Sequence, residues 1–294
     1  MSPLRGRVVL VTGAARGIGE AVAREVAARG GQLALVGLEP ERLQALSAEL
    51  SRGTGAEHFW ARADVTDQSS LDQAVRGALD ALGGIDVVVA NAGIANTGTV
   101  ATNPPDALAR TVEVNLIGVM RTVSATLPHV LESRGHYLLV ASAASFTVAP
   151  GLAAYCASKA GVESFGDAFR LEVAHQGVTV GTAHPIWIDT DLVRDAKEDL
   201  PLFRKSIENL PGPFGKQVDV QTCARMIVDG MEARKAKVFV PPSVGWVFHA
   251  RALLTTGPVR KLMAKEAARS VPRLEEQVRT LGRAFGRHST GLGD

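Results

Sequence analysis

Short apolar runs, separated by stretches with helical periodicity, are the feature that most constrains how this chain can fold. The runs predict strands at residues 7–12, 32–37, 57–62, 85–90, 136–141, 178–183 and 237–240. The helical stretches between them lie near residues 17–29, 40–51, 67–82, 106–131, 152–176 and 219–233. Several runs are apolar on both faces, as expected of buried parallel strands. The alternation therefore predicts an α/β fold with a doubly wound parallel sheet of about seven strands.

The pattern continues without a linker or an internal repeat, so we expect one catalytic domain over residues 1–245. Residues 246–294 form a basic extension with nine Lys or Arg residues against four acids. We expect amphipathic helices there, which pack on their own domain or alternatively on a partner or a membrane surface. Residues 191–218 are polar and contain three prolines. They predict a long loop at the carboxyl edge of the sheet, which is a candidate lid over the ligand.

Composition narrows the class of protein. A net charge of +2 is too balanced to indicate a nucleic-acid partner. The two cysteines, Cys156 and Cys223, match no metal or redox spacing, and we expect no metal site. No signal peptide is recognisable, and no apolar run approaches the roughly 20 residues that span a bilayer. These observations predict a soluble, cytoplasmic protein.

A glycine-rich turn, TGAARGIG from Thr12 to Gly19, follows the first predicted strand and leads into a helix. Backbone N–H groups and the helix dipole at such a turn favour a pyrophosphate. Gly13 permits the tight turn, Gly17 lets the backbone approach the ligand, and Gly19 lets the helix press on the sheet. The turn therefore predicts a dinucleotide-binding site.

The spacing of these glycines resembles that of the short-chain dehydrogenase/reductase family, whose turn reads TGxxxGIG. Further motifs of the family follow in order: Asp64-Val65, Asn91-Ala92-Gly93, Asn115, Ser142 and the stretch from Tyr155 to Lys159. The resemblance covers about residues 5–240. It implies a Rossmann-like fold, a nicotinamide cofactor, and hydride transfer between that cofactor and an alcohol or ketone carbon.

The resemblance also implies the residues that contact the cofactor. They are Gly13, Ala15, Arg16, Gly17, Ile18, Gly19, Leu38, Asp64, Val65, Asn91, Ala92, Gly93, Tyr155, Lys159, Ile188 and Thr190. The family usually has glycine where this chain has Ile186, so the resemblance does not fix the backbone there. Ile188 and Thr190 remain in register with the family.

Tyr155 and Lys159 are four residues apart on a predicted helix, so their side chains project from one face. An isolated tyrosine has a pKa of about 10 and is a reluctant acid–base catalyst at neutral pH. A neighbouring ammonium is expected to lower that pKa. Ser142 lies at the end of the fifth strand, where its hydroxyl can hold a substrate oxygen near Tyr155. Ser145, one turn further on, is an alternative.

Asn115 falls on the apolar stripe of its predicted helix, where an amide costs free energy unless it is hydrogen-bonded. One interpretation is that its side chain only stabilises a local distortion of the helix. The resemblance implies another, in which Asn115 supports a chain of water molecules running to Lys159. We favour the second, and the predicted catalytic group is Asn115, Ser142, Tyr155 and Lys159.

The choice of cofactor depends on the end of the second strand, where a carboxylate selects NAD and a nearby cation selects NADP. The chain has Gly37 at the usual acidic position, and Arg16 in the glycine turn can pair with a phosphate. Glu39 argues the other way if its side chain turns inward. We therefore expect NADP, with NAD as the alternative.

The substrate is expected to be a hydrophobic alcohol, ketone or aldehyde, because the candidate pocket residues are mostly apolar. They are Phe146, Val148, Leu152, Trp187, Leu192 and Phe203. Family members commonly pair the helices equivalent to residues 106–131 and 152–176, which implies a homodimer or homotetramer. Two alternatives stay open: a nucleotide-sugar epimerase or dehydratase, for which the tail is too short a substrate domain, and a non-catalytic protein that senses the cofactor.

Overall fold

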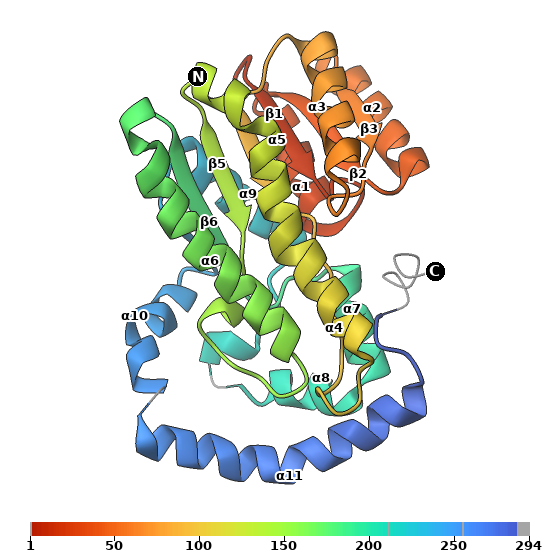
Figure 1. The fold of residues 1–294 in the computed structure, drawn as a ribbon, viewed down its shortest axis with the longest axis vertical. Helices are drawn as coiled ribbons and strands as arrows, with labels where there is room; N and C mark the ends of the chain where they lie inside the picture. The colour runs from red at the N-terminus through yellow and green to blue at the C-terminus, as the bar shows by residue number, and fades with distance from the viewer. Residues whose placement is uncertain (1, 211, 255, 287–294) are drawn as a thin grey trace.

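A single parallel sheet organises the chain, for which a computed structural model describes residues 2–210, 212–254 and 256–286 (Figure 1). Its strand order is β3-β2-β1-β4-β5-β6-β7. The strands are β1 (Val8–Thr12), β2 (Gln32–Gly37), β3 (Phe59–Arg62), β4 (Val87–Ala90), β5 (His136–Val140), β6 (Thr179–Pro185) and β7 (Lys237–Val240). Each neighbouring pair runs parallel. The predicted doubly wound sheet is confirmed.

Helices cover both faces of this sheet. The helices are α1 (Gly17–Ala28), α2 (Pro40–Thr54), α3 (Gln68–Leu82), α4 (Pro105–Val112), α5 (Gly118–Glu132), α6 (Ala153–Val173) and α9 (Val220–Glu232). Val9 and Val11 of β1 are buried with residues of α1, α2 and α9, whereas Leu10 is buried with residues of α3, α5 and α6. Successive strand residues point to opposite faces, so a strand that is apolar throughout serves both layers.

The strand order reverses between β1 and β4. The first connections lead from β1 outward to β2 and β3, and the chain then returns to place β4 on the other side of β1. In open α/β sheets the ligand crevice lies at the carboxyl ends of the strands beside such a reversal. The glycine turn after β1 and the Asn91-Ala92-Gly93 segment after β4 are therefore the two walls that a ligand would meet first.

Residues 191–218 are not the long loop that their prolines predict. They contain α7 (Asp191–Asp199), α8 (Pro201–Glu208) and a short 3-10 turn, η4 (Gly212–Gly215). Pro201 lies in the first turn of α8, where a missing N–H costs nothing because the first amides of a helix have no partner within it. The prediction of an irregular segment was wrong because the proline begins a helix.

The C-terminal extension is helical, as predicted. It contains α10 (Val244–Leu254) and α11 (Gly257–Leu281), which runs along the lower end of the molecule in Figure 1. Near its end, Glu275 accepts a hydrogen bond of 2.8 Å from Thr99, and Val278 is buried. Beyond α11, Arg283 forms an ion pair with Asp199. The extension thus packs on its own domain; residues 287–294 lie outside the described part.

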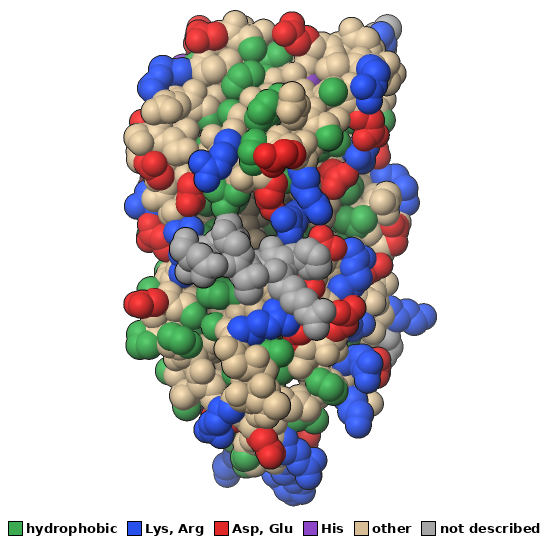
Figure 2. Space-filling view, turned by 90° about the vertical axis from the view of Figure 1, so that its right-hand side faces the viewer, with side chains coloured by type: hydrophobic (Ala, Val, Ile, Leu, Met, Phe, Trp, Pro, Cys, Tyr) green, Lys and Arg blue, Asp and Glu red, His purple; other side chains and the backbone are tan. Residues whose placement is uncertain are grey.

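Charge is unevenly spread on the face drawn in Figure 2. Acidic and basic side chains are interspersed over its upper part, and Lys and Arg side chains project at its lower end, where Figure 1 places α11. Among the residues that the structure describes, no helix is both long enough and apolar enough to cross a bilayer. Contact of the extension with a membrane surface stays a prediction.

Candidate active site

The glycine turn after β1 leaves no room for a Cβ at Gly13 or at Gly19. Gly13 and Gly17 have φ values of +64° and +56°, which glycine adopts without steric cost. A Cβ on Gly13 would lie 2.9 Å from Cα of Ala92, and one on Gly19 would overlap the carbonyl of Gly13. The turn therefore brings the N-terminus of α1 to the crevice with its backbone N–H groups available for an anion.

Asn91 joins the two walls of the crevice. Its side-chain amide donates to the carbonyl oxygens of Thr12 and Gly13 at 3.0 and 3.2 Å. Its backbone N–H donates to the hydroxyl of Thr12 at 3.0 Å. These bonds hold the β1 turn and the β4 turn together, so this crevice is pre-formed.

A cleft at this edge of the sheet gathers most of the predicted cofactor contacts. They are Gly13, Arg16, Gly17, Ile18, Leu38, Asp64, Val65, Asn91, Ala92, Gly93, Tyr155, Lys159 and Thr190. Three other predicted contacts do not line it: Ala15 and Ile188 are buried, and Gly19 packs within the turn. The cleft residues that the sequence did not single out include Ile94, Arg110, Val114 and Asp191.

Asp64 is fixed by neighbours that its motif does not reveal. Its carboxylate accepts from the N–H and the hydroxyl of Thr66, both at 2.8 Å, and pairs with Arg110 at 3.2 Å. Burial by itself raises the pKa of Asp64, but these hydrogen bonds and the Arg110 charge outweigh it, and the pKa is lowered. No spacing rule relates Arg110 to Asp64, since they meet only when α4 packs beside the β3 turn.

Tyr155 and Lys159 lie on one face of α6, as predicted. The ammonium of Lys159 is 5.8 Å from the centre of the Tyr155 ring and donates to the carbonyl oxygen of Val140 at 2.8 Å. Burial raises the pKa of Tyr155, which a hydrogen bond with Ser142 only partly offsets. Burial also lowers the pKa of Lys159 to about 8. The expected lowering of the tyrosine pKa is thus not found, because desolvation of the phenolate dominates.

Ser142 is the serine that reaches the tyrosine. It is buried beyond the end of β5, and its hydroxyl donates to the carbonyl oxygen of Pro185 at 3.3 Å. It also caps the 3-10 turn η2 (Ala143–Ser145) by accepting from the N–H of Ala144 at 3.1 Å. The alternative, Ser145, donates instead to the carboxylate of Glu163 at 2.6 Å. The geometry therefore favours Ser142 over Ser145 beside Tyr155.

Asn115 lies in a π-helical turn, η1 (Glu113–Ile117), that interrupts the predicted long helix between α4 and α5. Its side chain accepts from the N–H of Ile94 at 2.8 Å and donates to the Ile94 carbonyl at 2.9 Å. It also donates to the hydroxyl of Ser158 at 3.1 Å. The buried amide is satisfied, and it ties the π-helical turn to the segment after β4 and to α6.

Arg16 of the glycine turn and Glu39, just after the end of β2, are the charged residues that the sequence analysis relates to cofactor choice. The guanidinium of Arg16 forms an ion pair with the carboxylate of Glu39, and both line the cleft. Gly37 lines the cleft as well and carries no side chain. A bound phosphate would compete with Glu39 for Arg16, whereas a ribose hydroxyl would compete with Arg16 for Glu39.

The predicted substrate-pocket residues separate into different places. Leu192 lines the cleft beside Tyr155. Phe146 and Val148 instead line a second hollow of about 730 Å³, with Met263 of α11 on its other side. Trp187 and Phe203 pack edge to face, with ring centres 5.6 Å apart. The cleft that contains Tyr155 is therefore walled by fewer of these apolar residues than expected.

Comparisons with known proteins show which family this chain resembles. A family model described as "short chain dehydrogenase" matches residues 7–201. The chain is 35% identical to glycine betaine reductase ATRR of Emericella nidulans over 228 residues, which are 77% of this chain but 18% of that protein. It is 28% identical to 2,5-dichloro-2,5-cyclohexadiene-1,4-diol dehydrogenase LinX of Sphingobium indicum, covering 83% and 97% of the two chains. An alcohol dehydrogenase structure from the archaeon Thermococcus sibiricus, complexed with 5-hydroxy-NADP, aligns with a TM-score of 0.67 at 26% identity, covering 79% and 95%.

Proposed function

The chain belongs to the short-chain dehydrogenase/reductase family, and from that premise we propose that Asn115, Ser142, Tyr155 and Lys159 are its catalytic group. The family and its dehydrogenase relatives make it an NAD(P)-dependent oxidoreductase acting on CH–OH or C=O groups. This assignment is favoured over an epimerase, a dehydratase or a non-catalytic cofactor sensor. The observation that carries the catalytic proposal is the convergence of Tyr155, Lys159 and the cofactor cleft beside Ser142.

A nicotinamide cofactor fits the cleft because the glycine turn at the N-terminus of α1 lines it together with the Asn91-Ala92-Gly93 segment, and the backbone N–H groups of such a turn favour a pyrophosphate. When bound, the nicotinamide ring supplies a hydride to a carbonyl carbon or accepts one from an alcohol carbon. The three remaining proposed cofactor contacts, Ala15, Gly19 and Ile188, do not line the cleft: Ala15 and Ile188 are buried, and Gly19 packs against the Gly13 carbonyl.

Tyr155 is proposed as the general acid in reduction. Its phenol gives a proton to the substrate oxygen as the hydride adds to the carbon, so that a carbonyl becomes an alcohol. The raised pKa keeps Tyr155 protonated at neutral pH, which suits proton donation. The hydroxyl of Ser142 lies close enough to hold the same oxygen and to stabilise the charge that develops on it.

Lys159 and Asn115 are proposed to serve that proton transfer. An ammonium near the tyrosine stabilises a phenolate after the proton has left. Asn115 holds the Ile94 backbone beside the ammonium: a Cβ on the adjacent Gly93 would lie 3.5 Å from Nζ of Lys159. A proton route from Lys159 past this turn to solvent is part of the proposal.

NADP is the proposed cofactor. Support comes from Gly37, which offers no carboxylate, and from the guanidinium of Arg16 at the cleft. The archaeal alcohol dehydrogenase of similar fold is complexed with an NADP derivative. Glu39 opposes the proposal, because its ion pair with Arg16 must open before a phosphate can bind there.

A hydrophobic alcohol or ketone is the proposed substrate class. Support comes from Leu192, Val114 and Ile94 in the lining of the cleft, and from the ring diol named for the Sphingobium relative. We further infer that residues 1–245 are the catalytic domain and residues 246–294 an extension of it. A homodimer or homotetramer is the proposed assembly.

One experiment tests the catalytic proposal with a matched control, since the chain has two tyrosines, Tyr137 and Tyr155. Fluorescence titration with NADPH and NADH is combined with a screen of apolar ketones on the unaltered protein, Tyr155→Phe and Tyr137→Phe. We expect Tyr155→Phe to bind cofactor within twofold of the unaltered protein but to lose turnover. Tyr137 is buried and hydrogen-bonded to Thr126 at 2.9 Å, so Tyr137→Phe should cost about 1 kcal/mol of stability and keep turnover. Near-normal turnover in Tyr155→Phe would refute the assignment.

A further inference from the structure

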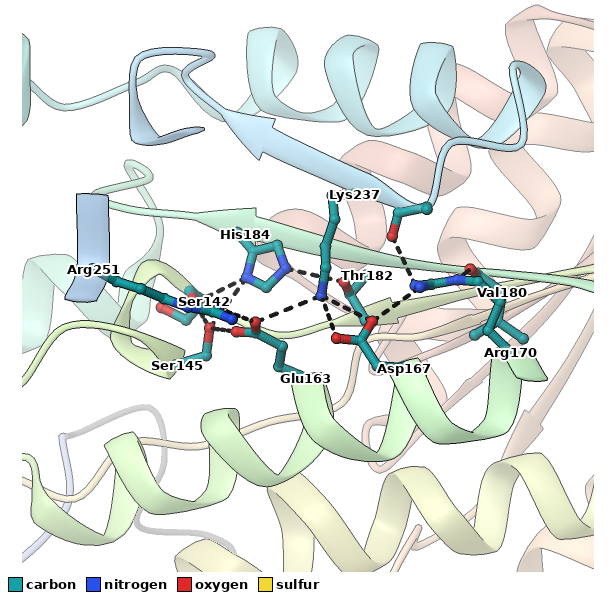
Figure 3. A network of polar contacts seen from close by, with 11 residues as sticks. Ser142, Ser145, Glu163, Asp167, Arg170, Val180, Thr182, His184, Lys237 and Arg251 are labelled. Atoms are coloured by element: carbon teal, nitrogen blue, oxygen red, sulfur yellow. Dashed lines mark hydrogen bonds and ion pairs between the residues drawn. The ribbon is translucent and has the colours of Figure 1, made fainter. Parts of the chain in front are cut away.

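A row of charged and polar side chains lies behind Ser142, outside the cofactor cleft (Figure 3). Glu163 and Asp167 come from α6, His184 from β6, Lys237 from the start of β7, and Arg251 from α10. No motif of the sequence marks this cluster. The cluster connects Arg251 of the C-terminal extension, through Glu163, to Ser145 near the carboxyl end of β5.

Glu163 is the centre of the cluster. One of its carboxylate oxygens accepts from Arg251 at 2.8 Å and lies 3.5 Å from the ammonium of Lys237. The other accepts from the hydroxyl of Ser145 at 2.6 Å. Burial raises the pKa of Glu163, but the Ser145 hydrogen bond and the nearby cations outweigh it and lower the pKa. Glu163 is therefore a carboxylate at neutral pH.

The ionised Glu163 decides where the neighbouring protons lie. Ser145 has one hydroxyl proton, and a carboxylate at 2.6 Å takes it in preference to the Ser142 carbonyl at 2.7 Å, because a charged acceptor is stronger. Burial lowers the pKa of His184 to about 4, so its ring is neutral. Its Nδ1 lies 3.3 Å from the carbonyl oxygen of Ser142, which can only accept, and 3.2 Å from the hydroxyl oxygen of Ser145. This assigns the ring proton to Nδ1 and leaves Nε2 to accept from the Thr182 hydroxyl at 3.0 Å.

Besides Tyr155, the Ser142 hydroxyl has two hydrogen-bond partners, and both belong to segments that this cluster contacts. The first is the N–H of Ala144, in the 3-10 turn that ends at Ser145. The second is the carbonyl of Pro185, next in the chain to His184. Loss of the Glu163 carboxylate would therefore disturb Ser142 through both the Ala144 segment and the Pro185 segment.

The other end of the cluster lies in the extension. Arg251 stacks over the ring of Phe248 with its guanidinium carbon 4.2 Å from the ring centre, and Phe248 packs edge to face on Phe146 at 5.3 Å. Phe146 directly follows the 3-10 turn. The guanidinium is thus held against Phe248 of its own helix, α10, while it donates to Glu163 of α6.

We propose that Glu163 is a positioning residue for Ser142 and that Arg251 of the C-terminal extension holds Glu163 in place. The extension is then part of what makes the site competent. The kinetic consequence rests on the proposed function, whereas the structural coupling does not.

Hydrogen–deuterium exchange of the segment from Ser142 to Phe146 tests the coupling without a substrate. We expect exchange there to be at least about tenfold faster in Glu163→Ala and in Arg251→Met. A tenfold change corresponds to about 1.4 kcal/mol in the free energy of local opening. Glu163→Gln keeps one acceptor oxygen, for either Ser145 or Arg251, and should restore only part of the protection. Glu172→Ala on the exposed side of α6 and Arg260→Met on α11 are the matched controls.

Turnover of acetophenone, an apolar ketone, together with NADPH titration gives the second readout. Both variants should lower kcat at least about tenfold, while KM and NADPH affinity stay within about twofold, because Ser142 acts on the reacting oxygen. Exchange within twofold of the unaltered protein in both variants would overturn the proposal. Faster exchange in Glu163→Ala alone would overturn the part assigned to Arg251. Faster exchange in a protein that reduces no ketone would support the coupling and count against the proposed catalytic role alone.

Discussion

The ammonium of Lys159 lies 5.8 Å from the centre of the Tyr155 ring and donates a hydrogen bond to the carbonyl oxygen of Val140. Desolvation moves their two pKa values apart: that of Tyr155 is raised and that of Lys159 is lowered to about 8. The phenol is thus protonated across the neutral range, and the ammonium is the group that titrates first as the pH rises.

The pH dependence of turnover should report Lys159. We expect kcat/KM for ketone reduction to be flat from pH 6 to about pH 8 and to fall above it, as the ammonium loses its proton. Lys159→Arg keeps a positive charge, so its residual activity should show no fall between pH 8 and pH 10. A fall centred below pH 7, or the same fall in Lys159→Arg, would contradict this assignment.

The ion pair between Arg16 and Glu39 should control cofactor choice. Arg16→Met is expected to weaken NADPH binding about tenfold or more, about 1.4 kcal/mol, and to leave NADH within twofold. Glu39→Gln should strengthen NADPH binding, because Arg16 no longer has a competing carboxylate. Arg24→Met on α1, whose guanidinium pairs with Glu49 at 2.5 Å, serves as the control. Equal losses for both cofactors in Arg16→Met would mean that Arg16 does not bind the phosphate.

Acid should destabilise the fold through His136. Burial lowers the pKa of His136 to about 3, from an ordinary value of 6.5. Between those two pH values the unfolded chain binds a proton at His136 more readily than the folded chain does. The contribution of neutral His136 to stability is therefore present above pH 6.5 and is lost as the pH falls. From pH 6.5 to pH 4 the loss should approach about 3 kcal/mol.

Thermal unfolding against pH measures that effect. His136→Gln keeps an acceptor for Thr179, which now lies 2.8 Å from Nδ1 of His136, and should flatten the acid limb of the curve. His175→Gln, at an exposed position, should leave it unchanged. An equally steep acid limb in His136→Gln would show that other groups cause the loss.

The outer face of α6 should mediate self-association. Ala153, Ala157 and Ala160 are exposed there, and such small side chains let a second helix approach closely. Light scattering should give the mass of a dimer or tetramer of the 30.9 kDa chain, and Ala157→Arg should reduce it to that of a smaller species. Ala81→Arg, at an exposed position of α3, should not. A monomeric unaltered protein would contradict the expected assembly.

The sequence by itself determined the sheet, the glycine turn and the pairing of Tyr155 with Lys159 on one helix face. These features are local: a strand buried on both faces is apolar throughout, a turn without room for Cβ atoms needs glycine, and residues four apart share a helix face. The predicted positions of all seven strands agree with the observed ones to within two residues at each end.

Only the tertiary structure decided which distant residues meet. Arg110 reaches Asp64 across two elements, and Glu163 holds Ser145 while Arg251 reaches it from the extension. It also reversed the expected direction of the Tyr155 pKa, because burial of the phenol depends on everything packed around it. Residues 191–199 and 201–208 form helices in which Val193, Ala196 and Ile207 are buried, a burial that the polar composition of this segment did not reveal. Charge pairing and desolvation depend on distances between residues far apart in the sequence, which no local pattern encodes, so only the tertiary structure determines them.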